Sequence, residues 1–216
     1  MVLKDDGWNK EEIRILRKLN TPRKIQDYLN ELRINFEEKG DTCLSPRMVL
    51  RSGKAHCVEG AIFAAAVLKF HGERPWILDL EANNEDFDHV ICVFEKNGYY
   101  GAISKTNHAV LRYREPVYKT LRELVMSFFH EYFINSNGKK TLRRYSDLVD
   151  LSIFDDRKWE FLEDVWFIPE YLSEIRHFDI LERWHLKSLR KADDIEMQAG
   201  KIVKEKDPLK RKDGLG

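Results

Sequence analysis

The first third of the chain carries apolar residues at helical spacing, interrupted by residues that start and stop helices. Thr21 and Pro22 precede one such run, as an N-cap residue and a first helical residue commonly do. Ser45 starts a second run in the same way, and Gly53 ends it. We therefore predict two helices within residues 9–38 and a further short helix after Ser45.

The central segment combines a nearly all-apolar helix with a strand and a hairpin. Residues 57–70 are rich in alanine and carry few polar side chains, a pattern typical of a helix buried on all sides. The following "PWILDLEA" predicts a strand. "HVICVFEKNGYYGAIS" predicts a β-hairpin that turns at Asn97 and Gly98, because both residue types accept a positive φ. "YKTLRELVMSFFHEYF" then predicts an amphipathic helix.

The C-terminal third mixes aromatic residues with helix signals before it becomes highly charged. "LVDLSIF" favours a further strand, and "DVWFIPEYLSEIRHFDILERWHLKSL" predicts helices that pack on the core. Residues 191–216 contain few large apolar side chains, so we predict a disordered tail there and a single domain over residues 1–190. The predicted fold is α+β. A buried helix that bears Cys57 packs on a mainly antiparallel sheet, with N-terminal helices beside it and C-terminal helices covering the sheet.

Charge and cysteine content narrow the possible functions. Lys plus Arg and Asp plus Glu are each 37, so no net charge draws the chain to nucleic acid, and we expect no nucleic-acid partner. No apolar run approaches the roughly 18 residues of a membrane span, and the N-terminus does not resemble a signal peptide. We therefore expect a cytoplasmic protein with no membrane partner. The three cysteines lack the paired spacing of a disulfide scaffold or a zinc site, and we expect no metal and no cofactor.

Two residues in the central segment point to thiol chemistry. Cys57 opens the predicted buried helix, where free N–H groups and the helix dipole favour a thiolate. His89 starts the predicted hairpin, whose turn places Thr106 opposite His89 and Ser104 on the diagonal. An imidazole beside a thiol can accept its proton and later deliver it to a leaving group, while a third polar residue holds the imidazole tautomer.

The stretch "GKAHCVEGAIFAAAVLKFHGERPWILDL", followed by "DHVICVFEKNGYYGAIS", resembles the transglutaminase-like superfamily of papain-type fold, over residues 40–110. In that superfamily a Cys opens the central helix, a His starts a strand, and an acid, usually Asp, follows on the neighbouring strand. Cys57 and His89 match the first two positions, whereas the acid position falls on Ser104. The Trp that usually follows the superfamily's His is absent. The resemblance implies a cysteine peptidase, amidase or acyltransferase.

Several residues are candidates for the third role. Ser104 can accept a hydrogen bond but supplies no negative charge. Asn107 can act as an amide does in papain-like enzymes, and Asp86 or Asp88 can approach His89 from the start of its strand. The candidate catalytic residues are Cys57, His89, Ser104 and Asn107.

Other functions stand beside thiol-dependent acyl chemistry on a peptide, protein or small amide substrate. A serine at the acid position favours a binding module of the same fold without turnover. Alternatively, Cys57 is an inert core residue, as free cysteines often are, and the aromatic C-terminal half docks a partner protein. We interpret His56 as a turn residue and Glu59 as a residue that complements the helix dipole.

Overall fold

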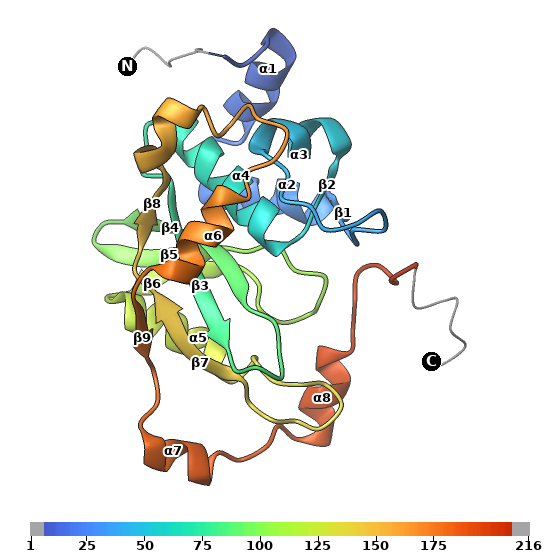
Figure 1. Ribbon diagram of the computed structural model, residues 1–216, viewed down its shortest axis with the longest axis vertical. Helices are drawn as coiled ribbons and strands as arrows, with labels where there is room; N and C mark the ends of the chain where they lie inside the picture. The colour runs from blue at the N-terminus through green and yellow to red at the C-terminus, as the bar shows by residue number, and fades with distance from the viewer. Residues whose placement is uncertain (1–6, 209–216) are drawn as a thin grey trace.

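A computed structural model, which describes residues 7–208, arranges the chain around one seven-stranded sheet (Figure 1). Its strands are β3 (Trp76–Ala82), β4 (His89–Lys96), β5 (Tyr99–Ile103), β6 (Arg114–Tyr118), β7 (Leu142–Ser146), β8 (Val149–Asp150) and β9 (His177–Asp179). The strand order is β6-β5-β4-β3-β7-β9, with β8 also paired to β3, and every pairing is antiparallel. A separate parallel pair joins β1 (Arg33–Ile34) to β2 (Lys54–Ala55). The predicted α+β class with a mainly antiparallel sheet is confirmed.

The helices gather in groups around this sheet. They are α1 (Lys10–Lys18), α2 (Pro22–Glu31), α3 (Pro46–Ser52), α4 (Cys57–Phe70), α5 (Leu121–Phe129), α6 (Phe167–Glu174), α7 (Arg183–Ser188) and α8 (Asp194–Gly200), with a 3₁₀ helix η1 (Leu151–Arg157). Figure 1 shows α1–α4 at one end of the molecule and α7 and α8 at the other. Among residues 7–208, no helix is long and apolar enough to cross a membrane.

Local signals for the first helices are confirmed by the hydrogen bonds at their ends. The Thr21 hydroxyl accepts from the Lys24 N–H, and Ser45 caps α3 in the same way. Gly53 ends α3 with a φ of 65°, a left-handed conformation that costs glycine little. The hairpin also turns at Asn97 and Gly98, as predicted.

The core has two parts, one on each face of the sheet. On one face, Cys92 and Ile103 pack with α4, whose residues from Glu59 to Leu68 are all buried. On the other face, Ile91 and Val93 pack with α5. We expected C-terminal helices to cover the sheet, but α5 covers this second face. Of the later helices, α6 contributes buried residues beside α4, whereas α7 contributes none.

Three strands in the C-terminal half differ from the predictions. One is β9, which lies within the stretch that we predicted as helices. The strand predicted for "LVDLSIF" is only Val149–Asp150, because Asp150 accepts a hydrogen bond from the Ser152 N–H and thereby starts η1. The strand β7 was not predicted, since its sequence, LRRYS, has only its two end residues buried and two adjacent arginines between them. The strand conformation of β7 is stabilised by backbone pairing with β3, and its own side chains do not predict it.

Residues 191–208 are ordered, contrary to the prediction of a disordered tail. After α8, the chain pairs with the segment that follows β5. The Ala109 N–H donates to the Ile202 carbonyl, and the Lys204 N–H donates to the Asn107 carbonyl. Backbone hydrogen bonds hold this segment, whose Ile202 and Val203 side chains are exposed. The rest of the predicted tail, residues 209–216, lies outside the described residues.

Gly60 offers a test of how closely α4 approaches the sheet. A Cβ at Gly60 would lie 2.4 Å from the Cβ of Lys105, an atom that cannot swing away from its own backbone. Helix propensity alone would make Gly60→Ala stabilising by about 1 kcal/mol. Overpacking costs about 1–3 kcal/mol and should outweigh this gain. We expect urea denaturation to give a lower free energy of unfolding for Gly60→Ala, and a more stable variant would contradict the close approach.

Candidate active site

Cys57 lies at the N-terminus of α4 and lines a cleft of about 510 Å³. Its side chain is partly exposed, whereas Cys43 and Cys92 are buried. The cleft lies between the start of α4 and three segments that connect the strands. Its lining residues are Ile34, His56, Cys57, residues 85–89, residues 105–108, Val110, Leu111 and residues 131–135.

His89 is the first residue of β4 and lines the same cleft as Cys57, where its imidazole helps to lower the pKa of the thiol. The contact with Ser104 fixes the tautomer: His89 Nε2 lies 2.8 Å from Ser104 Oγ, and Ser104 Oγ donates to the Leu111 carbonyl at 2.6 Å. Because the single hydroxyl hydrogen is used on Leu111, Ser104 must accept from His89, so Nε2 carries a proton. Nδ1 is therefore the nitrogen that remains available to Cys57.

Ser104 is itself held in place by a glutamine from α2. The Gln26 side-chain oxygen accepts from the Ser104 N–H at 2.9 Å, and the Gln26 side-chain nitrogen donates to the Ser104 carbonyl at 2.9 Å. Both residues are buried. This pair of hydrogen bonds sets the position of the Ser104 hydroxyl just beyond the end of β5, where the ladder to β4 has stopped.

Asn107 does not orient His89. Its amide nitrogen donates to the Glu205 carbonyl, and its amide oxygen accepts from the Glu205 N–H, both at 2.9 Å. The amide is therefore fully used in tying the C-terminal segment to the cleft wall. Asp88 accepts from the Ala82 N–H and Asp86 from the Thr141 hydroxyl, so neither carboxylate pairs with His89. The structure thus brings together Cys57, His89 and Ser104.

A second imidazole, that of His56, lines the same cleft. His56 is the N-cap residue of α4, and its side chain helps to lower the pKa of Cys57. His56 Nε2 lies 2.9 Å from the Thr42 carbonyl, which can only accept, so this nitrogen carries a proton and Nδ1 remains available to Cys57. We had interpreted His56 as a turn residue, and the structure instead places it in the site.

Glu59, one turn into α4, is the carboxylate nearest to His56. Its side chain is 0% exposed, and its Oε1 lies 3.4 Å from His56 Nε2. Beyond a capping role, it accepts hydrogen bonds from several separate segments. The donors are the Asn35 amide, the Thr42 hydroxyl, the Leu44 N–H and the His56 N–H.

The two imidazoles change the protonation of Cys57. Burial alone would raise the pKa of the thiol, but hydrogen bonds from His56 and His89 outweigh burial and lower the pKa to about 5. Burial alone would lower the pKa of His56, but its hydrogen bond to Cys57 and the charge of Glu59 raise the pKa to about 9. Between these values the sulfur is a thiolate and His56 an imidazolium.

Sequence reasoning underestimated three polar residues. His56 and Glu59 flank Cys57 in "HCVE", and a Glu that precedes an unbroken apolar run was the available signal that a carboxylate would be buried. Gln26 lies beside Ile25 on the buried face of α2, where a polar side chain needs a partner. Its partner, Ser104, is distant in the sequence, so the sequence alone could not identify the contact.

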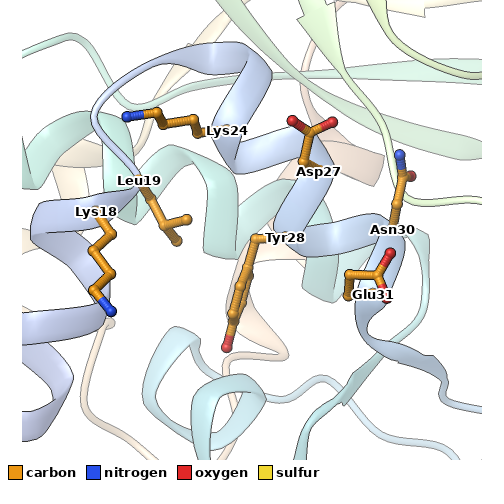
Figure 2. Close-up of a pocket in the computed structure, with 7 residues that line it drawn as sticks. All are labelled: Lys18, Leu19, Lys24, Asp27, Tyr28, Asn30 and Glu31. Carbon is orange, nitrogen blue, oxygen red and sulfur yellow. The ribbon is translucent and has the colours of Figure 1, made fainter.

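A second cavity, of about 430 Å³, lies beside α1 and α2 (Figure 2). Figure 2 shows Lys18 on one helix and Lys24, Asp27 and Tyr28 on the next. This cavity shares no lining residue with the cleft at Cys57, and its lining contains no cysteine, serine, threonine or histidine. We therefore place the candidate chemistry at the Cys57 cleft. Among residues 7–208, no group of three or more His, Cys, Asp or Glu is arranged to hold a metal ion.

Comparisons with known proteins do not assign the chain. No protein-family model matches the sequence, and no curated protein matches it. The site is therefore interpreted from its own geometry.

The protonation of Cys57 predicts selective alkylation. Burial raises the pKa of Cys43 to about 12 and also raises the pKa of Cys92, so both stay neutral and covered. We expect iodoacetamide at pH 6 to add one label, on Cys57, at a rate that falls only as the pH drops below about 5. Mass spectrometry after proteolysis identifies the labelled residue, and Cys57→Ser should abolish labelling. Equal labelling of all three thiols would contradict the assignment.

Ser104 and Asn107 form a matched pair for testing what orients His89. Ser104→Ala leaves the buried His89 Nε2–H and the Leu111 carbonyl without partners, which should lower the free energy of unfolding by about 1–3 kcal/mol. It should also release the His89 tautomer, as observed by ¹⁵N NMR of the imidazole. Asn107→Ala should leave the His89 spectrum unchanged and speed amide hydrogen exchange at Glu205. A changed His89 spectrum in Asn107→Ala alone would reverse the assignment.

Proposed function

We propose that the protein performs thiol-dependent acyl chemistry on an amide or peptide, as a transglutaminase-like cysteine peptidase, amidase or acyltransferase. The observation that carries this proposal is the placement of Cys57 and His89 on one accessible cleft, with His89 hydrogen-bonded to Ser104. The order of a cysteine at a helix start and a histidine at a strand start agrees with the resemblance to that superfamily. A thiolate is the reactive form of cysteine, and the surroundings of Cys57 favour it.

In the acylation step, Cys57 Sγ bonds to the carbonyl carbon of the substrate. The carbonyl oxygen becomes an oxyanion, which the N–H groups at the start of α4 can stabilise. As the carbon–nitrogen bond breaks, the leaving amine takes the proton that His89 carries on Nδ1. The product of this step is a thioester on Cys57, with His89 neutral and still bound to Ser104 through Nε2.

In the deacylation step, neutral His89 accepts a proton from the attacking group. Water as the attacking group yields an acid, whereas an amine yields a new amide. The carbon–sulfur bond breaks, Cys57 leaves as a thiolate, and His89 is again protonated. No metal or organic cofactor takes part in this sequence.

The cleft walls offer both polar and apolar contacts to a peptide. Phe87 is 89% exposed at the cleft, beside the carboxylates of Asp86 and Asp88. Val110 and Phe133 add apolar surface on the neighbouring segments. A substrate segment that combines an apolar side chain with a positive charge fits this lining.

The serine at the acid position favours a second candidate, a binding module of the same fold without turnover. Ser104 orients His89 but places no negative charge beside it. Such a module would retain the cleft and the acidic thiol, yet would not form a thioester. The two candidates therefore differ in acylation and not in thiol reactivity.

Acylation by p-nitrophenyl acetate tests the proposed function. We expect a burst of p-nitrophenolate and one acetyl group on Cys57, detected by mass spectrometry, and no acetylation in Cys57→Ser. Because p-nitrophenolate leaves without a proton, His89→Gln should still be acetylated but should lose the acetyl group about 100-fold more slowly. Added methylamine distinguishes transfer from hydrolysis. A thiol that alkylates rapidly but is never acetylated would favour the binding module.

A further inference from the structure

Cys57 is flanked by two imidazoles, but only one of them has a carboxylate beside it. Glu59 Oε1 lies 3.4 Å from His56 Nε2. The position next to His89 Nε2 is instead occupied by the neutral hydroxyl of Ser104. The third residue of a catalytic triad commonly places a negative charge next to the imidazole that exchanges protons. Here the residue next to His89 is neutral, and the carboxylate lies next to His56 instead.

The Glu59 side chain accepts a hydrogen bond from each of its four donor residues, as a carboxylate does. The Leu44 N–H, the His56 N–H and the Asn35 side-chain N–H can only donate to it. A protonated carboxyl group would have to place its own hydrogen against one of these donors or displace the Thr42 hydroxyl, which lies 2.8 Å from Oε1. A carboxylate that is 0% exposed requires a nearby positive charge, and His56 supplies it.

The other titratable groups near Cys57 and His56 do not change the pairing of the Glu59 carboxylate with the His56 imidazole. Glu37 Oε1 lies 3.7 Å from His56 Nε2 and adds to the negative charge around that imidazole. Burial raises the pKa of Cys43 to about 12, and burial also raises the pKa of Tyr132, so both groups stay neutral. The groups around the sulfur that can carry a charge are thus Glu59, Glu37, His56 and His89.

We propose that the two histidines have separate roles: His56, kept as a permanent imidazolium by Glu59, stabilises the Cys57 thiolate, and His89 alone exchanges protons with the substrate. His56 contacts the reacting sulfur and is a catalytic residue, whereas Glu59 is a positioning residue that acts through His56. The division deepens the proposed function and rests on it. In both steps of that reaction the proton moves only between His89 and the substrate, and His56 gains and loses none.

The rate of iodoacetamide alkylation as a function of pH separates the two roles without a substrate. His56→Asn retains a hydrogen-bond donor near the sulfur but removes the charge. We expect its alkylation midpoint to move toward the ordinary thiol value of about 8.5, with at least a tenfold or so lower rate at pH 6. His89→Gln should keep a midpoint below about 7. Glu59→Gln should behave like His56→Asn, because an uncharged partner no longer holds the imidazolium.

Two control variants account for effects unrelated to charge. His71→Asn alters a histidine at the opposite end of α4, where Nε2 bonds to the Leu16 carbonyl. Glu160→Gln alters another buried carboxylate, which pairs with Lys69. Both should alkylate like the unaltered protein.

A measurement on the unaltered protein decides the question if the variants fail to fold. We expect ¹⁵N NMR to show both ring nitrogens of His56 protonated at pH 7.5, before and after Cys57 is alkylated, since Glu59 remains. His56 that becomes neutral once the thiolate is removed would overturn the proposal. So would an ordinary thiol in His89→Gln, or a thiol that stays acidic in a folded His56→Asn. Each of these three results would count against the separate roles of the two histidines alone. Slow alkylation of the unaltered protein at pH 6 would count against the proposed function as well.

Discussion

The buried carboxylate of Glu59 is the interaction on which the candidate site depends. It joins the start of α4 to Asn35, which follows β1, and to Thr42 and Leu44 in the segment before α3. These contacts come from three segments of the chain and converge on one side chain. A carboxylate without its donors would be costly to bury, so the segments must assemble together around it. The same assembly places the Thr42 carbonyl against His56 and thereby sets the imidazole beside the sulfur.

The strand side of the site is assembled by a different principle. There, the contacts are neutral: Gln26 holds the backbone of Ser104, and Ser104 holds His89 and the Leu111 carbonyl. Neutral hydrogen bonds hold an imidazole ring in a fixed orientation, but they have little effect on whether the ring is protonated. The thiol therefore lies between a helix side that sets charge and a strand side that sets orientation.

The fold was predictable wherever local chemistry decides it. Caps such as Thr21 and Ser45, the Asn97–Gly98 turn and the alanine-rich run of α4 each act over a few residues, and each was read correctly. The strand β7 and the ordering of residues 191–208 depend on pairing with distant backbone, which leaves little trace in the side chains. Of the site, the hairpin register placed Ser104 near His89, but it could not exclude Asn107, whose amide pairs with Glu205 across 98 positions of sequence.

In the proposed reaction, the serine at the position of the superfamily's acid leaves the negative charge beside the other imidazole, that of His56. A carboxylate behind His89 would favour its imidazolium in every state and would oppose the return of a proton to the leaving amine. In the proposed reaction, the group beside His89 whose charge changes is the sulfur, which is negative before acylation and neutral after it. His89 gives its proton to the leaving amine as the thioester forms. In the same proposal, Glu59 and His56 keep the thiolate available, because their charges do not change as the sulfur reacts.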